Sequence, residues 1–172
     1  MNGSSQYSVF TRDEFYYCIP IDQVREVIRT PQLILAPVRT LGFLGFLDFR
    51  QTLCPVIDIS SLIRGQTAEP QEGAFTLMVL ERDASVFALL IDRFVESILL
   101  EEAAPIEQAQ NPEGRHIIEH VFRYADKALS KVDLAYLKSY LASNVQDQLL
   151  DKAANWVEQE AAKRLLADLK GG

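Results

Sequence analysis

Short apolar runs separated by turn-forming residues make up most of the chain before residue 135. Residues 6–10 and 14–19 are two such runs, and they flank the charged pair Arg12-Asp13, a pattern that predicts a hairpin. Residues 24–29 interleave apolar and polar types, as a half-buried strand does. The beginning of the chain is therefore predicted to be β-structure.

The same pattern continues further along the chain. Residues 45–59 are rich in Phe, Leu, Val and Ile, with a turn predicted around Arg50-Gln51. The remaining predicted strands lie in residues 75–81, 86–92 and 94–100, followed by a final hairpin formed by residues 117–125 and 127–134. Two sets of strands joined by polar loops predict a mainly β protein built from two small barrels.

The C-terminal part has a different character. From about Leu134 there is no Pro or Gly until Gly171-Gly172, and helix-forming residues dominate. Ser143-Asn144 is predicted to cap a helix that runs to about Lys170. We therefore divide the chain into a β domain, residues 1–141, and a helical extension, residues 142–172. The apolar stripe of this extension comprises Leu150, Ala154, Val157, Ala161, Leu165 and Leu169.

Two interpretations of this stripe remain open at the level of sequence. The favoured one is that it packs on the protein's own barrels, as the apolar face of most surface helices does. The other is that it binds a partner or a second copy, although no heptad repeat is sustained.

Composition narrows the class of protein. With 48% hydrophobic residues, 24% charged residues and a net charge of -7, the chain is globular and unsuited to nucleic acid, which needs a concentrated Lys/Arg surface. Cys18 and Cys54 lie in apolar runs and are interpreted as buried free thiols rather than a disulfide. No signal peptide is evident, and Asp92, Arg93 and Glu96 interrupt the most apolar stretch. We expect a cytoplasmic protein without membrane insertion.

One motif points to metal chemistry. His116, Glu119 and His120 form H-x-x-E-H, the signature of a class of zinc protease. Such a site needs a helix, whereas the segment continues into β-branched and aromatic residues. On a strand, positions i and i+4 lie about 13 Å apart, too far to bind one zinc ion. A zinc hydrolase is therefore a disfavoured alternative, and no cofactor or metal is expected.

A second and much longer set of residues is specific enough to indicate a protein family. Its members are Ile19, Pro20, Ile21, Val24, Glu26 and Val27, then Gly45 and Arg50, then Pro55, Val56, Ile57 and Asp58. In order and spacing they resemble the motifs of the CheW family, the coupling proteins of bacterial chemosensory arrays. A weaker likeness continues through residues 86–100, where Asp92 matches, and covers residues 6–141 in all. The resemblance implies two five-stranded SH3-like barrels side by side, to which the sequence adds the C-terminal α-helix.

The resemblance also implies a function. Members of the family have no enzymatic activity; they connect the regulatory domain of a CheA-type histidine kinase to the cytoplasmic tip of methyl-accepting chemoreceptors. The implied role is thus an adaptor in chemotaxis or a related two-component pathway, including variants that control pilus-driven or light-directed motility. A CheW-like module of a kinase pathway outside chemotaxis is the alternative.

The residues matching the family's partner-binding positions are Val24, Glu26, Val27, Gly45 and Arg50. Structural roles are equally open for some of them: Val24 and Val27 as core residues, and Arg50 as the internal ion-pair partner of Asp48 or Asp58.

The chain departs from the family pattern beside Arg50. Where the family has Asn and Gly, this chain has Asp48 and Gln51. Because glycine adopts backbone angles that glutamine disfavours, we expect the departure to affect the turn.

Overall fold

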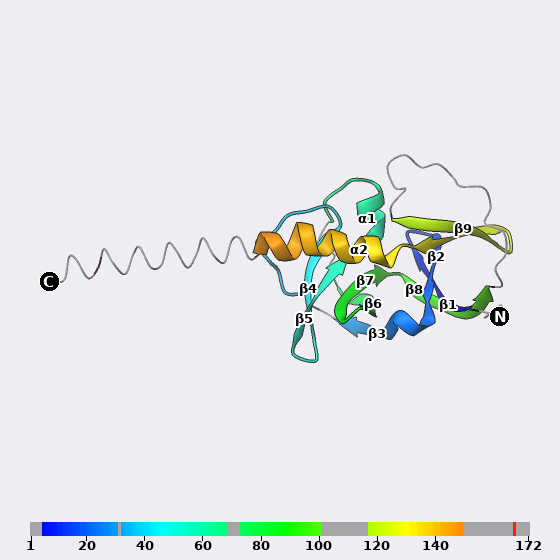
Figure 1. Ribbon diagram of the computed structural model, residues 1–172, viewed down its shortest axis with the longest axis horizontal. Helices are drawn as coiled ribbons and strands as arrows, with labels where there is room; N and C mark the ends of the chain where they lie inside the picture. The colour runs from blue at the N-terminus through cyan, green and yellow to red at the C-terminus, as the bar shows by residue number, and fades with distance from the viewer. Residues whose placement is uncertain (1–4, 31, 69–72, 101–116, 150–166, 168–172) are drawn as a thin grey trace.

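The computed structural model describes residues 5–30, 32–68, 73–100, 117–149 and 167. Within these residues the protein is mainly β, with two five-stranded sheets (Figure 1). The first sheet comprises β8 (Arg93–Leu100), β1 (Ser5–Arg12), β2 (Phe15–Pro20), β10 (Lys127–Val132) and β9 (Ile118–Tyr124), in that order. The second comprises β3 (Val24–Thr30), β6 (Phe75–Arg82), β7 (Ser85–Ile91), β5 (Thr52–Ile57) and β4 (Phe43–Phe49). These sheets are the two barrels that the sequence predicts.

The first barrel is assembled from both ends of the described chain. The hairpin β1–β2 pairs through β1 with β8 and through β2, in parallel, with β10. A hydrogen bond from the Tyr124 hydroxyl to Glu96 links the two outer strands of this sheet, β9 and β8. The second barrel is inserted between β2 and β8, and the short 3-10 helix η1 (Ile21–Gln23) forms the passage into it.

Among the described residues, the buried apolar side chains form three cores, because several strands are buried on both faces. Val9, Cys18 and Leu129 fill the first barrel, whereas Leu47, Leu77 and Val79 belong to the core of the second. A larger core lies between the barrels and under α2 (Leu134–Leu141). It includes Phe10, Tyr17 and Ile19 from the first sheet, Met78, Leu80 and Phe87 from the second, and Leu137 and Leu141 from α2.

Tight two-residue turns connect the two strands of three hairpins. The pairs Asp13-Glu14, Arg50-Gln51 and Asp83-Ala84 all have positive φ at both positions. This is the backbone of a type I′ turn, whose twist matches that of the strands it joins. The strand pairing confirms the N-terminal hairpin, the turn at Arg50-Gln51 and the final hairpin β9–β10. The first turn lies at Asp13-Glu14, one residue later than the predicted pair Arg12-Asp13, because Arg12 still belongs to β1.

The C-terminal helix begins earlier than predicted. Asp133 is the N-cap of α2, and its side chain accepts a hydrogen bond from the backbone N–H of Tyr136 at 3.0 Å. The helix continues through the π-helical segment η2 (Ala142–Gln146) to Leu149. The prediction that Ser143-Asn144 caps a new helix is wrong, since both residues lie inside this segment. All six residues of the predicted apolar stripe, from Leu150 to Leu169, lie outside the described residues.

Both cysteines are buried and free, as interpreted from the sequence. Burial raises the pKa of Cys18 and of Cys54 to about 12, so neither thiol is a reactive nucleophile near neutral pH. In the described part of the chain, no helix is long and apolar enough to cross a membrane.

Candidate functional site

The five residues that match partner-binding positions all lie on the second barrel. Val24, Glu26 and Val27 belong to β3, Gly45 to β4, and Arg50 to the turn between β4 and β5. The structure brings two of them into contact: Arg50 Nη2 donates a hydrogen bond to Glu26 Oε1, with 3.3 Å between nitrogen and oxygen. This contact places the end of the β4–β5 hairpin beside the outer strand β3.

An irregularity in β3 decides which of its side chains face outward. The register with β6 shifts between Val24 and Glu26, a bulge that re-aims the side chains beyond it. Val24 is half-buried and packs against the central core, which agrees with a structural role. Val27, by contrast, is 41% exposed and therefore available to a partner.

Gly45 is buried and serves the close approach of two chain segments. Its φ is +130°, and a Cβ built on it would lie 2.6 Å from the carbonyl oxygen of Ile34. Ile34 reaches β4 there through two backbone hydrogen bonds with Phe46, each 2.7 Å long. Gly45 thus positions the segment that carries Ile34 and Leu35, which are 47% and 78% exposed.

The Arg50 turn keeps left-handed backbone angles although it lacks glycine. The φ values are 51° at Arg50 and 68° at Gln51, a conformation disfavoured by residues with a Cβ. Asp48 supports the turn, since its Oδ1 accepts a hydrogen bond of 3.1 Å from the Gln51 backbone N–H. The Arg50 guanidinium also lies 5.0 Å from the centre of the Phe49 ring, within cation–π range.

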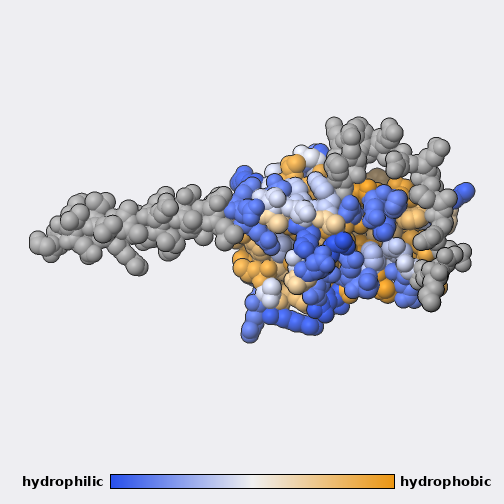
Figure 2. All heavy atoms as spheres, viewed as in Figure 1, coloured by the Kyte–Doolittle hydropathy of each residue, from blue (hydrophilic) through white to orange (hydrophobic). Residues whose placement is uncertain are grey.

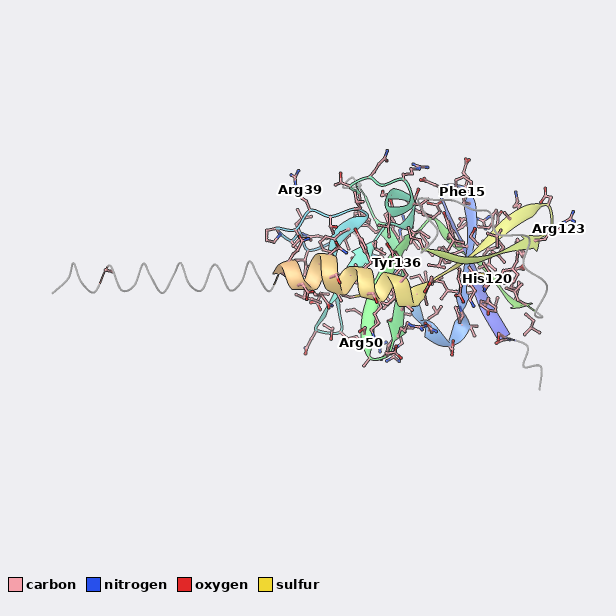
Figure 3. All side chains as sticks on the ribbon, turned by 45° about the horizontal axis from the view of Figure 1, so that its top comes forward. Phe15, Arg39, Arg50, His120, Arg123 and Tyr136 are labelled. Carbon is pink, nitrogen blue, oxygen red and sulfur yellow. The ribbon has the colours of Figure 1, made fainter. Side chains whose placement is uncertain are left out.

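Arg50 therefore forms an internal ion pair, but not the one proposed from sequence. Its partner is Glu26 on β3, not Asp48 or Asp58. The side chain of Arg50 is 77% exposed, so the pair lies at the surface and contributes little to stability. Figure 3 labels Arg50, whose turn projects from the second barrel.

The turn is bordered by apolar surface. Leu53, on β5, lies directly opposite Asp48 in the hairpin and is 59% exposed. The projecting end of this hairpin is hydrophilic, with apolar surface visible beside it (Figure 2). An exposed apolar patch with charged residues at its rim is typical of a protein interface.

A second polar cluster, which the sequence did not predict, is centred on Arg12. Arg12, at the end of β1, donates to both carboxylate oxygens of Asp58, each at 2.9 Å, and to Asp92 Oδ1 at 3.1 Å. Asp58 is also the N-cap of α1 (Ile59–Ile63), where its side chain accepts from the Ser60 N–H. Because Arg12 belongs to the first barrel and Asp58 to the second, this cluster joins the two barrels.

The charge state of the cluster is set by opposing effects. Burial alone would raise the pKa of Asp58, but hydrogen bonds and the charge of Arg12, with donors from Ser61 and Ser60, lower it below its usual value. In the sequence, Asp58 and Asp92 match motif positions, and the only role considered for either is that of Asp58 as an ion-pair partner of Arg50. The sequence feature that could have indicated this cluster is the acidic residue that directly follows each of two apolar strands, Asp58 after β5 and Asp92 after β7.

The H-x-x-E-H motif is only partly described. His116 lies outside the described residues, whereas Glu119 and His120 lie on β9. Glu119 pairs with Lys131 of the neighbouring strand at 3.5 Å, and the His120 side chain is 41% exposed. Among the residues that the structure describes, no three His, Cys, Asp or Glu side chains are grouped to hold a metal ion.

Two five-stranded sheets share a core with α2, and an exposed turn of the second sheet is bordered by apolar surface. Comparison with known proteins agrees: the CheW-like domain matches residues 6–139, and the chain belongs to this family. Among solved structures, the chain is similar to the scaffolding protein TtCheW from Thermoanaerobacter tengcongensis. That match has a TM-score of 0.65 and 18% identity, and it covers 78% of this chain and 87% of the other. A search of curated proteins found no match.

Proposed function

We propose that this protein is a non-catalytic, cytoplasmic adaptor that couples a CheA-type histidine kinase to the cytoplasmic tip of methyl-accepting chemoreceptors. The kinase would contribute its regulatory domain. The observation that supports this function best is the surface of the second barrel in a chain of the CheW-like family. There Val27 and Leu53 are exposed, and the Glu26–Arg50 pair joins β3 to the β4–β5 turn at the surface.

The physical form of this surface suits a transient protein contact. Apolar side chains such as Leu53 would be buried on binding, while the charges of Glu26 and Arg50 would remain at the rim and favour correct partners. In this proposal Gly45 acts indirectly, by holding the Ile34 segment in place, and Val24 supports β3 from the core side.

The decisive experiment is a binding measurement with the cognate kinase and a receptor cytoplasmic fragment, each purified. We expect micromolar or tighter retention of the kinase by the wild-type chain. Val27→Asp and Arg50→Glu should each weaken one partner by about tenfold, because one places a charge in apolar surface and the other sets two acids side by side.

Arg123→Glu is the matched control for Arg50→Glu. Arg123 is an exposed arginine on β9 of the first barrel (Figure 3), so its reversal changes net charge equally without touching the proposed surface. A wild-type chain that retains no kinase contradicts the proposal. Loss of both partners together with unfolding, in either test variant, would assign Val27 and Arg50 a structural role instead.

A further inference from the structure

The two barrels are joined by two kinds of contact that differ in what they fix. The central core between them is apolar and includes Phe10 and Ile19 from the first sheet and Met78 and Phe87 from the second. Apolar burial is non-directional, so it favours any arrangement in which the two faces pack well. The hydrogen bonds of the Arg12 cluster are directional, because each needs a donor and an acceptor at a defined distance and angle.

Arg12 attaches the first barrel to the rest of the molecule at two separate carboxylates. Its Nε and Nη2 each donate to one oxygen of Asp58 at 2.9 Å, and its Nη1 donates to Asp92 Oδ1 at 3.1 Å. Asp58 follows β5 of the second barrel, whereas Asp92 lies where the chain passes from β7 back to β8. A planar guanidinium that is held by a bidentate pair and a third hydrogen bond has little freedom to rotate.

A second set of contacts joins the barrels beside Arg12. Asp13, in the turn after β1, accepts a hydrogen bond from the Ser60 hydroxyl and pairs with Arg64 Nη2 at 3.1 Å. Ser60 lies in the first turn of α1, and Arg64 is the C-cap of this helix. The end of the β1–β2 hairpin is therefore attached along the whole length of α1.

Stability alone does not account for a buried ion pair at this place. The side chains of Arg12 and Asp58 are 10% and 6% exposed, and the cost of removing their charges from water offsets most of their attraction. Apolar side chains of similar volume often stabilise such a position as well or better. Across the described part of the chain, no buried side-chain nitrogen or oxygen lacks a hydrogen-bond partner. The network is thus fully satisfied, and a satisfied buried network specifies one arrangement.

We propose that the Arg12 cluster is an orientation lock, which selects one angle between the two barrels among those that the central core alone would allow. This inference is independent of the proposed adaptor function, because it concerns how the barrels are joined and not what they bind. Its consequence is that surfaces on the two barrels keep a constant position relative to each other. The angle between the barrels and the folding of each barrel can then be changed separately.

The test variant is Arg12→Met/Asp58→Asn, which removes both charges of the buried pair. Asparagine keeps a side-chain oxygen that can accept the Ser60 N–H at the start of α1. Its matched control is Arg25→Met/Glu81→Gln, which removes an ion pair between β3 and β6 inside the second barrel. Urea denaturation of each variant establishes that it is folded under the conditions of the measurement.

The angle between the barrels would be measured as a distance between two spin labels by double electron–electron resonance. One label is attached to a cysteine introduced at Arg29 on β3 and the other to a cysteine introduced at Arg123 on β9, both exposed positions. A second pair, at Arg29 and Thr52, reports on the second barrel alone. Cys18 and Cys54 are buried and do not compete for the label.

We expect one narrow distribution of the inter-barrel distance in the wild-type background and in the control variant. Arg12→Met/Asp58→Asn should shift this distribution, widen it or divide it into two, and leave the distribution within the second barrel unchanged. An unchanged inter-barrel distance in the folded test variant overturns the inference. So does an equal change in the control variant or within the second barrel, since either would indicate general loosening.

A milder variant keeps the proposal testable where Arg12→Met/Asp58→Asn does not fold. Ser60→Ala/Arg64→Met removes only the contacts of α1 with Asp13 and retains the buried pair. We expect a smaller widening of the inter-barrel distance in this variant, again without change inside the second barrel. A distribution as narrow as that of the wild type would refute the lock.

Discussion

The α-carbon of Gly45 faces the backbone of Ile34, where there is no room for a side chain. An added Cβ would lie 2.6 Å from the Ile34 carbonyl oxygen, and φ is +130°. We therefore expect Gly45→Ala to lower the free energy of unfolding by about 2–3 kcal/mol, through strain and loss of the Ile34–Phe46 bridge. Urea denaturation monitored by circular dichroism would measure the change.

Gly65→Ala separates steric crowding from backbone angle. Gly65 also has positive φ, +65°, but a Cβ there would have no neighbour within 4 Å. Its substitution should cost only the left-handed backbone penalty, about 1 kcal/mol. If Gly45→Ala proves no more destabilising than Gly65→Ala and yet abolishes kinase binding, Gly45 contributes to the interface rather than to packing.

At this scale the sequence predicts candidate residues but not their contacts. Motif spacing makes Glu26 and Arg50 candidates, but their ion pair joins β3 to the turn after β4, and these two strands are not adjacent in the sheet order. The pair depends on how the barrel closes, which no local pattern specifies. The roles of Arg12, Asp58 and Asp92 were missed for the same reason.

At the scale of an element, the first residue of helix α2 could not be predicted from local sequence either. The composition of the C-terminal part correctly predicts a helix, but two segments offer a cap: Asp133 directly after β10, and Ser143-Asn144. Both are favourable N-cap types, so propensity alone cannot choose between them. Packing decides, because Leu134, Leu137 and Leu141 are all buried in the central core and require the helix to start before them.

The position of the cap can be tested directly. Asp133→Ala should lower the free energy of unfolding by about 1 kcal/mol, since it removes the acceptor for the Tyr136 N–H. Ser143→Ala should be neutral or slightly stabilising, because alanine is the better helix former inside a helix. Thermal denaturation of both variants measures the difference. A larger loss for Ser143→Ala than for Asp133→Ala would contradict this assignment of the helix start.

At the scale of the whole molecule, the strands were predictable and their assembly was not. Apolar runs and turn residues mark the hairpins because those interactions are local. The pairing of β2 with β10, in parallel, joins segments from opposite ends of the described chain, and the central core draws on both barrels. Such non-local contacts produce no periodic pattern in the sequence. For the first barrel, only the family resemblance predicted that strands from both ends would form one barrel.

The Arg12 cluster carries the clearest prediction for the joined barrels. The side chains of Arg12 and Asp58 are only 10% and 6% exposed, so removing one partner leaves the other charge buried. Arg12→Met should therefore cost about 3 kcal/mol or more at neutral pH, measured by urea denaturation. Adding Asp58→Asn should restore part of that loss, because the unpaired carboxylate is then gone.

Acid should diminish this difference between wild type and Arg12→Met. In the wild type the pKa of Asp58 is lowered, so its contribution is complete above the unfolded-state pKa of about 3.9 and is lost as pH falls through the lowered folded-state pKa. In Arg12→Met, burial without the cation raises the pKa of Asp58, and protonation relieves its penalty at a higher pH. The two unfolding free energies should thus converge as pH falls from 7 to 3. A difference that stays constant over this range would mean that the Asp58 charge does not hold the two barrels together.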